Sequence, residues 1–63
     1  MKEFRCTFET EKLDVWAMCE LVKCATELKC QISFSPMNIF MHIDCDRREI
    51  FLWLHGYKKL FGA

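Results

Sequence analysis

The sequence predicts an α+β fold with the element order β-α-β-β-α, in which two helices lie on one face of a small open sheet of three strands. Three observations predict it. Apolar residues alternate over residues 2–9, recur with helical spacing over residues 14–29, and alternate again in two segments within residues 30–45. A last segment with helical spacing completes the order. The 63 residues are expected to form a single domain, residues 1–63, which buries only about 60% of its unfolded surface.

The first strand is predicted over residues 2–9 and the first helix over residues 14–29. Odd and even positions of the strand separate apolar from polar residues: Phe4, Cys6 and Phe8 against Arg5, Thr7 and Glu9. Thr10 or Asp14 can cap the first turn of the helix with a side-chain oxygen. The apolar stripe of the helix contains Leu13, Ala17, Leu21, Cys24, Ala25 and Leu28.

A hairpin is predicted next, with strands over residues 30–34 and 39–45. The turn between them, residues 35–38, contains Pro36 and Asn38, which suit tight turns. The second strand places four residues on its inner face and three on its outer face: Ile39, Met41, Ile43 and Cys45 against Phe40, His42 and Asp44.

The last segment, residues 47–61, is rich in residues that favour strands, but its spacing favours a helix. The apolar stripe contains Ile50, Trp53, Leu54, Tyr57, Leu60 and Phe61. Gly56 can end or bend this helix. Phe51 and Leu52 lie off the stripe and are expected to stay outside.

The apolar content, 52% of residues, is high for so small a body and predicts apolar surface at an interface. We therefore expect a homodimer, with Trp53, Tyr57 and Phe61 as candidate self-association residues. The formal net charge is zero, but the C-terminal segment is basic. Its cations, with Trp53 and Tyr57 between them, leave a small nucleic-acid-binding regulator as the alternative function: Arg47, Arg48, Lys58 and Lys59.

Neither a secretory leader nor an apolar run long enough for a membrane span is evident, which predicts a soluble, cytoplasmic protein without membrane contact. The five cysteines show no Cys-x-x-Cys spacing and are expected to be small apolar groups in a reducing compartment. Cys19, near the start of a helix, is the best candidate for a reactive thiol. A zinc site that uses Cys45 and His42 is a further alternative, although no paired ligand spacing supports it.

No catalytic constellation is readable in the chain, so an enzyme is not expected, and neither a cofactor nor a metal is predicted. His42 and His55 are the only imidazoles, and neither has a nucleophile at a readable spacing. Both are interpreted as surface histidines.

The series Leu21-Val22-x-x-Ala25-x-x-Leu28-x-x-x-Ile32-x-Phe34, together with the element order, resembles the bacterial histidine phosphocarrier (HPr) family. The resemblance covers residues 2–57. It implies a phosphorylation motif at residues 15–19, where this chain has Val-Trp-Ala-Met-Cys. Trp16 replaces the phosphorylated histidine and Met18 the arginine that holds the phosphoryl group, while Glu49 replaces a regulatory serine. An indole cannot carry a phosphoryl group, so phosphocarrier activity is excluded if this alignment holds.

The chain also ends before the family's fourth strand and last helix, and that strand lies between the first two. Three outcomes are open: the first two strands pair directly, a second copy supplies contacts, or the fold differs. The function that the resemblance implies is a non-enzymatic protein-interaction or inhibitory module with a degenerate HPr-like fold. Its partner surface would contain Trp16, Cys19, Phe51 and Leu52. A phage-encoded inhibitor would suit this size, although no residue shows viral origin.

Overall fold

The computed structural model describes residues 3–62, except for the side chains of residues 61 and 62. The elements are β1 (Phe4–Glu9), α1 (Val15–Glu27), β2 (Gln31–Phe34), β3 (Phe40–Cys45) and α2 (Arg48–Gly62), with 3-10 turns at Thr10–Lys12 and Pro36–Asn38. The predicted α+β class and the order β-α-β-β-α are confirmed.

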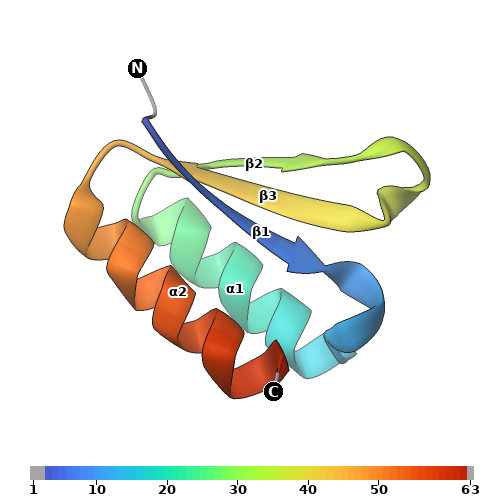
Figure 1. Cartoon of the computed structure of the whole chain (residues 1–63). Helices are drawn as coiled ribbons and strands as arrows, with labels where there is room; N and C mark the ends of the chain where they lie inside the picture. Colours follow the sequence, from blue (N-terminus) through green and yellow to red (C-terminus); the bar gives the residue numbers. More distant parts are fainter. Residues whose placement is uncertain (1–2, 63) are drawn as a thin grey trace.

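The sheet has the strand order β1-β3-β2, and β3 is antiparallel to both neighbours. Both helices lie on the same side of the sheet and run in opposite directions (Figure 1). This is a split β-α-β arrangement, because the connection through α1 skips one strand position and β3 then fills it. Direct pairing of the first two strands, one of the outcomes left open by the sequence, is therefore wrong. β1 and β2 are both edge strands.

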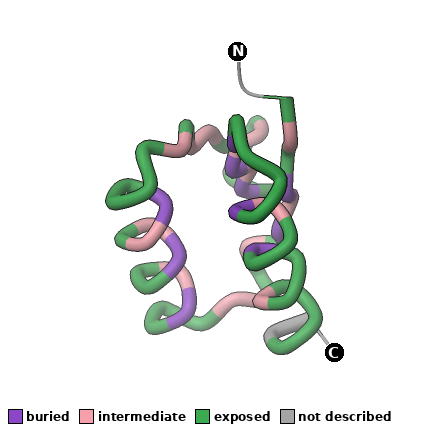
Figure 2. Tube along the Cα trace, turned by 90° about the vertical axis from the view of Figure 1, so that its left-hand side faces the viewer, coloured by how far each residue is buried: buried purple, intermediate pink, exposed green. Residues whose placement is uncertain are grey.

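The core lies between the sheet and the two helices. The buried residues follow one side of each helix, as Figure 2 shows. The predicted alternation of β1 and β3 is confirmed, because every second residue of each strand enters this core. The buried cluster consists of Cys6, Phe8, Leu21, Ala25, Met41, Ile43, Cys45, Ile50 and Leu54. Ile39, predicted to be inward, lies before β3 and is 52% exposed.

Helix α1 begins and ends at recognisable signals. The Asp14 carboxylate accepts a hydrogen bond from the Ala17 N–H at 2.7 Å, which confirms Asp14 as the cap. At the other end Lys29 has a φ of 59°, and the Cys30 N–H donates to the Ala25 carbonyl at 2.9 Å. The left-handed backbone at Lys29 ends α1, whose last residue is Glu27, whereas the predicted helix had included Lys29.

Helix α2 runs through Gly56 without interruption, so the segment is a helix and does not end there. Its stripe is buried at Ile50 and Leu54, whereas Trp53 is 40% exposed. Phe51 was expected to lie outside, and this is wrong. Its ring centroid lies 5.7 Å from that of Phe4, which is close enough for Phe51 to pack against the edge of the core. No helix in the described part of the chain is long and apolar enough to cross a membrane.

Candidate interaction site

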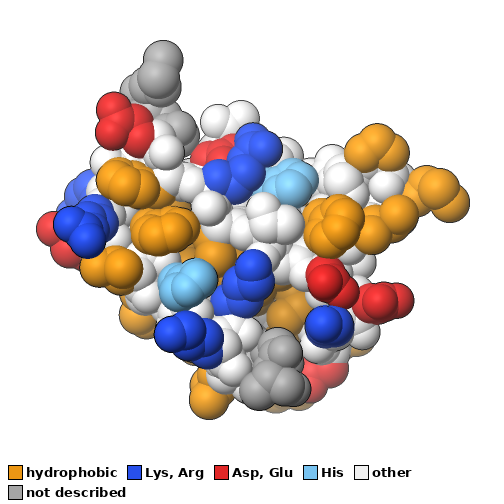
Figure 3. All heavy atoms as spheres, in the orientation of Figure 1, with side chains coloured by type: hydrophobic (Ala, Val, Ile, Leu, Met, Phe, Trp, Pro, Cys, Tyr) orange, Lys and Arg blue, Asp and Glu red, His pale blue; other side chains and the backbone are white. Residues whose placement is uncertain are grey.

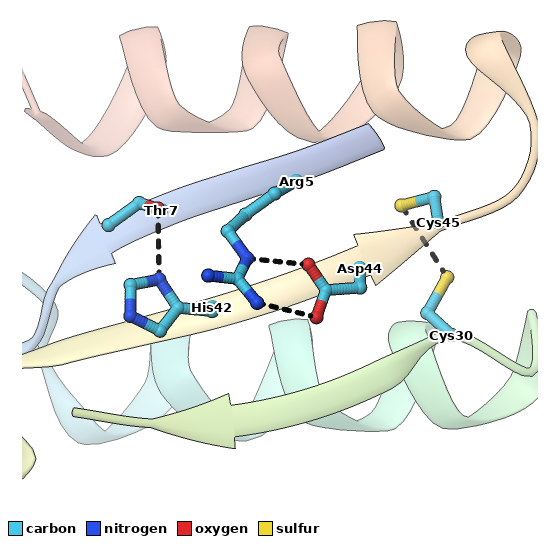
Figure 4. A network of polar contacts seen from close by, with 6 residues as sticks. All are labelled: Arg5, Thr7, Cys30, His42, Asp44 and Cys45. Carbon is cyan, nitrogen blue, oxygen red and sulfur yellow. Dashed lines mark hydrogen bonds and ion pairs between the residues drawn. The ribbon is translucent and has the colours of Figure 1, made fainter. Parts of the chain in front are cut away.

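The face of the sheet that the helices leave open carries paired polar side chains from β1 and β3 (Figure 4). Arg5 donates from Nε to Asp44 Oδ1 at 2.7 Å and from Nη2 to Asp44 Oδ2 at 3.2 Å. The hydrogen bonds and the positive charge of Arg5 hold the pKa of Asp44 below its ordinary value, and the same pair raises the pKa of Arg5. The pair joins an edge strand to the centre of the sheet.

Thr7 and His42 form the second polar pair on this face. The Thr7 hydroxyl and His42 Nδ1 share a hydrogen bond of 3.0 Å. A hydroxyl beside an imidazole is one part of a nucleophilic site, but such a site also needs a group that orients the imidazole. Asp44, the carboxylate two residues further along β3, is bound by Arg5 instead. The geometry therefore favours a structural role for this pair.

The sequence did not reveal these pairs, although it placed all four side chains on the outward faces of their strands. Thr7 and His42 are 35 residues apart, and they meet only because β1 pairs with β3 in the observed register. The alternation in each strand was the available signal, but alternation does not say which strands are neighbours.

Three of the five cysteines contribute to one region on the opposite face of the sheet. The Cys30 and Cys45 sulfurs lie 3.8 Å apart, and all five thiols are free. Burial, together with the hydrogen bond from Cys30 and the neighbouring thiols of Cys30 and Cys6, raises the pKa of Cys45 to about 12. Burial also raises the pKa of Cys6. Such groups stay neutral near pH 7 and pack as small apolar side chains.

The zinc site suggested for Cys45 and His42 is wrong. Cys45 is buried under the sheet, whereas His42 lies on the open face beside Thr7. Successive residues of a strand point to opposite faces, so side chains three positions apart cannot share one metal ion. Within residues 3–60 no group of three His, Cys, Asp or Glu residues is arranged to hold a metal.

Trp16 and its neighbours form an apolar surface at the start of α1. Val15 is 80% and Trp16 81% exposed, and a shallow depression beside them is lined by Asp14, Trp16, Ala17 and Glu20. Cys19 is exposed on the next turn of the helix. The hydrogen bond that Asp14 accepts from the Ala17 N–H fixes the backbone of the first turn, in which Trp16 lies.

The four predicted partner-binding residues do not lie together. Trp16 and Cys19 belong to the first turns of α1, and Phe51 and Leu52 to the first turns of α2. Because the helices run in opposite directions, these turns lie at opposite ends of the helical layer (Figure 1). Leu52 is 53% exposed, whereas Phe51 is partly buried between Phe4 and the His55 ring.

The predicted self-association residues lie on α2. The Trp53 and Tyr57 ring centroids are 4.7 Å apart, and the rings are inclined by 58°. Trp53 is partly exposed, while Tyr57 packs against the core. The side chain of Phe61 lies outside the described residues.

A second apolar surface, at the β2–β3 turn, was not predicted. Met37 is 91% exposed and has a φ of 64°, a left-handed conformation that is costly for a residue with a side chain. Phe34, Ile39 and Phe40 are also exposed around this turn. Hydrophobic side chains protrude at the corresponding end of the molecule in Figure 3. The signal in the sequence was the methionine within a Ser-Pro-Met-Asn turn, where polar residues are usual.

Comparison of the chain with protein-family models, with curated proteins and with solved structures gave no match.

Proposed function

We propose that this chain is a protein-interaction module that acts by binding, without turnover, and that self-associates as a homodimer. The observation that carries the proposal is the exposure of large apolar side chains: Trp16 is 81% exposed and Met37 is 91% exposed. In a chain of 63 residues, such surfaces lower the solubility of the isolated molecule. They are typical of proteins that bury them against a partner.

The surface around Trp16 indicates the chemistry of the partner that would bind there. Tryptophan is enriched among the residues that contribute most to binding, because its large rigid ring buries much apolar surface in the interface. The carboxylates of Asp14 and Glu20 border the same depression. A partner with an apolar pocket and basic side chains around it would match this surface in both shape and charge.

The resemblance to HPr stays a prediction, and so does an inhibitory action. Both agree with binding that involves no phosphoryl transfer, since the proposed alignment puts Trp16 and Met18 in place of the family's phosphate-handling residues. The free thiols support the predicted cytoplasmic location, because thiols persist in a reducing compartment.

The Trp16→Ala variant tests the binding surface. The immobilised full chain is used to capture proteins from a lysate, and bound proteins are quantified for wild type, Trp16→Ala and the control Lys23→Ala, which changes an exposed residue of the same helix. We expect Trp16→Ala to capture at least 10-fold less specifically bound protein than wild type, with an unchanged melting temperature. Equal capture by all three chains, or a loss that follows unfolding, would contradict the proposal.

The nucleic-acid alternative also stays a prediction. Arg47, Arg48, Lys58 and Lys59 are all exposed, which favours it. However, ten residues of helix, about 15 Å, separate the two pairs of cations, so the charge is divided between the ends of α2. Fluorescence anisotropy with a labelled oligonucleotide at 20 mM salt tests this function. Binding that weakens steeply with added salt would support it, and no binding would end it.

A further inference from the structure

Edge strand β1 directs a defined set of backbone groups away from the sheet. The Thr10 N–H donates to the Ile39 carbonyl at 3.0 Å, which makes this a hydrogen-bonded position between the two chain segments. Antiparallel pairs alternate between hydrogen-bonded and non-hydrogen-bonded positions. The next pair, Glu9 with Phe40, is therefore non-hydrogen-bonded, and the same holds for every second pair along β1.

The hydrogen bonds on the β2 side of β3 lead independently to the same alternation of hydrogen-bonded positions. The Ser35 N–H donates to the Phe40 carbonyl at 2.9 Å, so the backbone of Phe40 is directed toward β2 and away from β1. It follows that Arg5, Thr7 and Glu9 direct their N–H and C=O groups toward the open edge of β1. Within residues 3–60 no other segment bonds to these groups, which leaves them available to a further strand.

The side chains at these three positions are self-complementary. If a second copy of β1 lies antiparallel to the first with a two-fold axis at Thr7, Arg5 stands opposite Glu9 of the second copy, and Glu9 stands opposite its Arg5. Thr7 then stands opposite Thr7. Opposite charges at directly facing positions stabilise a strand pair, and facing threonines can share a hydrogen bond. The same three residues therefore supply both the free backbone groups and the matching charges.

We propose that two copies of this chain pair through β1, antiparallel and about a two-fold axis at Thr7, to form one continuous sheet with β1 strands at its centre. This inference rests on the self-association proposed above and identifies β1 as the interface. A two-fold axis perpendicular to the sheet keeps all helices on the same side, so the arrangement is closed and isologous. The two α2 helices are then neighbours, because α2 packs against β1, where the Phe51 ring lies beside that of Phe4.

The existing side-chain contacts leave room for the new ones. Arg5 uses Nε and Nη2 for Asp44, so Nη1 takes part in neither bond. Among the described residues, the Glu9 carboxylate forms an ion pair with Lys12 alone, at a long 3.7 Å between Nζ and Oε2, and both side chains are exposed. An exposed pair of this length contributes little and is easily replaced.

Two charge-reversed chains test the register. In Glu9→Arg dimers, guanidinium groups face each other at both ends of the strand pair, and in Arg5→Glu dimers carboxylates do so. We expect either variant alone to raise the dimer dissociation constant at least 10-fold in sedimentation equilibrium. An equimolar mixture restores opposite charges and should give a one-to-one heterodimer by native mass spectrometry. Glu27→Arg, which reverses an exposed charge at the far end of α1, is the control and should dimerise like wild type.

Thr7→Pro and Thr7→Val test the backbone. Proline removes the N–H that Thr7 directs to the open edge and leaves the bonds to β3 intact, whereas valine keeps the N–H and removes only the hydroxyl. We expect Thr7→Pro to be a folded monomer by circular dichroism and Thr7→Val to remain a dimer. A dimer that persists in Thr7→Pro and in both charge variants would overturn the β1 pairing and leave self-association through another surface. A wild-type chain that is monomeric at all concentrations would overturn both the β1 pairing and the proposed self-association, whereas it would leave the proposed capture through Trp16 unaffected.

Discussion

The guanidinium of Arg5 on β1 binds both carboxylate oxygens of Asp44 on β3, at 2.7 and 3.2 Å. The two residues are 39 positions apart in the chain and face each other in the observed register. This contact holds an edge strand to the central strand on the face that the helices do not cover. It therefore helps to fix the geometry of β1, on which the proposed pairing depends.

The Asp44→Asn variant tests this pair through its pH dependence. The pKa of Asp44 lies below its ordinary value of 3.8, so the interaction stabilises the fold above pH 3.8 and is lost as the pH falls below that value. We expect Asp44→Asn to melt at a slightly lower temperature than wild type at pH 7, and by a smaller margin near pH 2. A difference of equal size at both pH values would show that the charge of Asp44 is not its cause.

Local patterns in the sequence predicted the elements well. Alternation identified the buried residues of β1 and β3, and Asp14 was one of two candidates for the cap of α1. The spacing of Ile50 and Leu54 identified α2 against the strand propensity of its residues. Each of these features depends on neighbours within a few positions of the chain.

Features that depend on distant neighbours were not predictable in the same way. Phe51 lies off the apolar stripe of its own helix, yet it is partly buried because Phe4 is beside it. The Thr7–His42 pair requires the β1–β3 register, and strand neighbours are not encoded by alternation. The exposed Met37 is stable in its turn only because the hairpin around it determines the backbone.

The thiols are expected to differ in reactivity. Cys45, with a pKa of about 12, stays protonated and buried at pH 8, and burial protects Cys6 as well. Cys19 is exposed. Brief treatment of the folded chain with iodoacetamide, followed by peptide mass spectrometry, should label Cys19 first and leave Cys6 and Cys45 unmodified until the chain unfolds. Labelling of Cys45 at the rate of Cys19 would contradict the buried position.

Leu21 is fully buried between the helices and the sheet. Replacing it with alanine leaves a cavity, and such changes cost about 2–5 kcal/mol. A domain this small has little stability to lose, so we expect Leu21→Ala to be largely unfolded by circular dichroism at 37 °C. The matched control is Leu52→Ala, at an exposed leucine of α2, which should retain the wild-type melting temperature. Similar losses for both variants would contradict the described core.

Gly56 offers a stabilising change. It lies inside α2, and an added methyl group at this position would meet no atom within 4 Å. Because alanine favours helix over glycine by about 1 kcal/mol, Gly56→Ala should raise the free energy of unfolding by that amount in urea titration. A lower stability would show that α2 does not continue through Gly56 in solution.

Sedimentation equilibrium of the wild-type chain over a range of concentrations tests the central claim most directly. The chain has a mass of 7.6 kDa, and self-association through one closed two-fold interface predicts a concentration-dependent rise to twice that value and no further. A mass of 7.6 kDa at every concentration up to 1 mM would contradict the account.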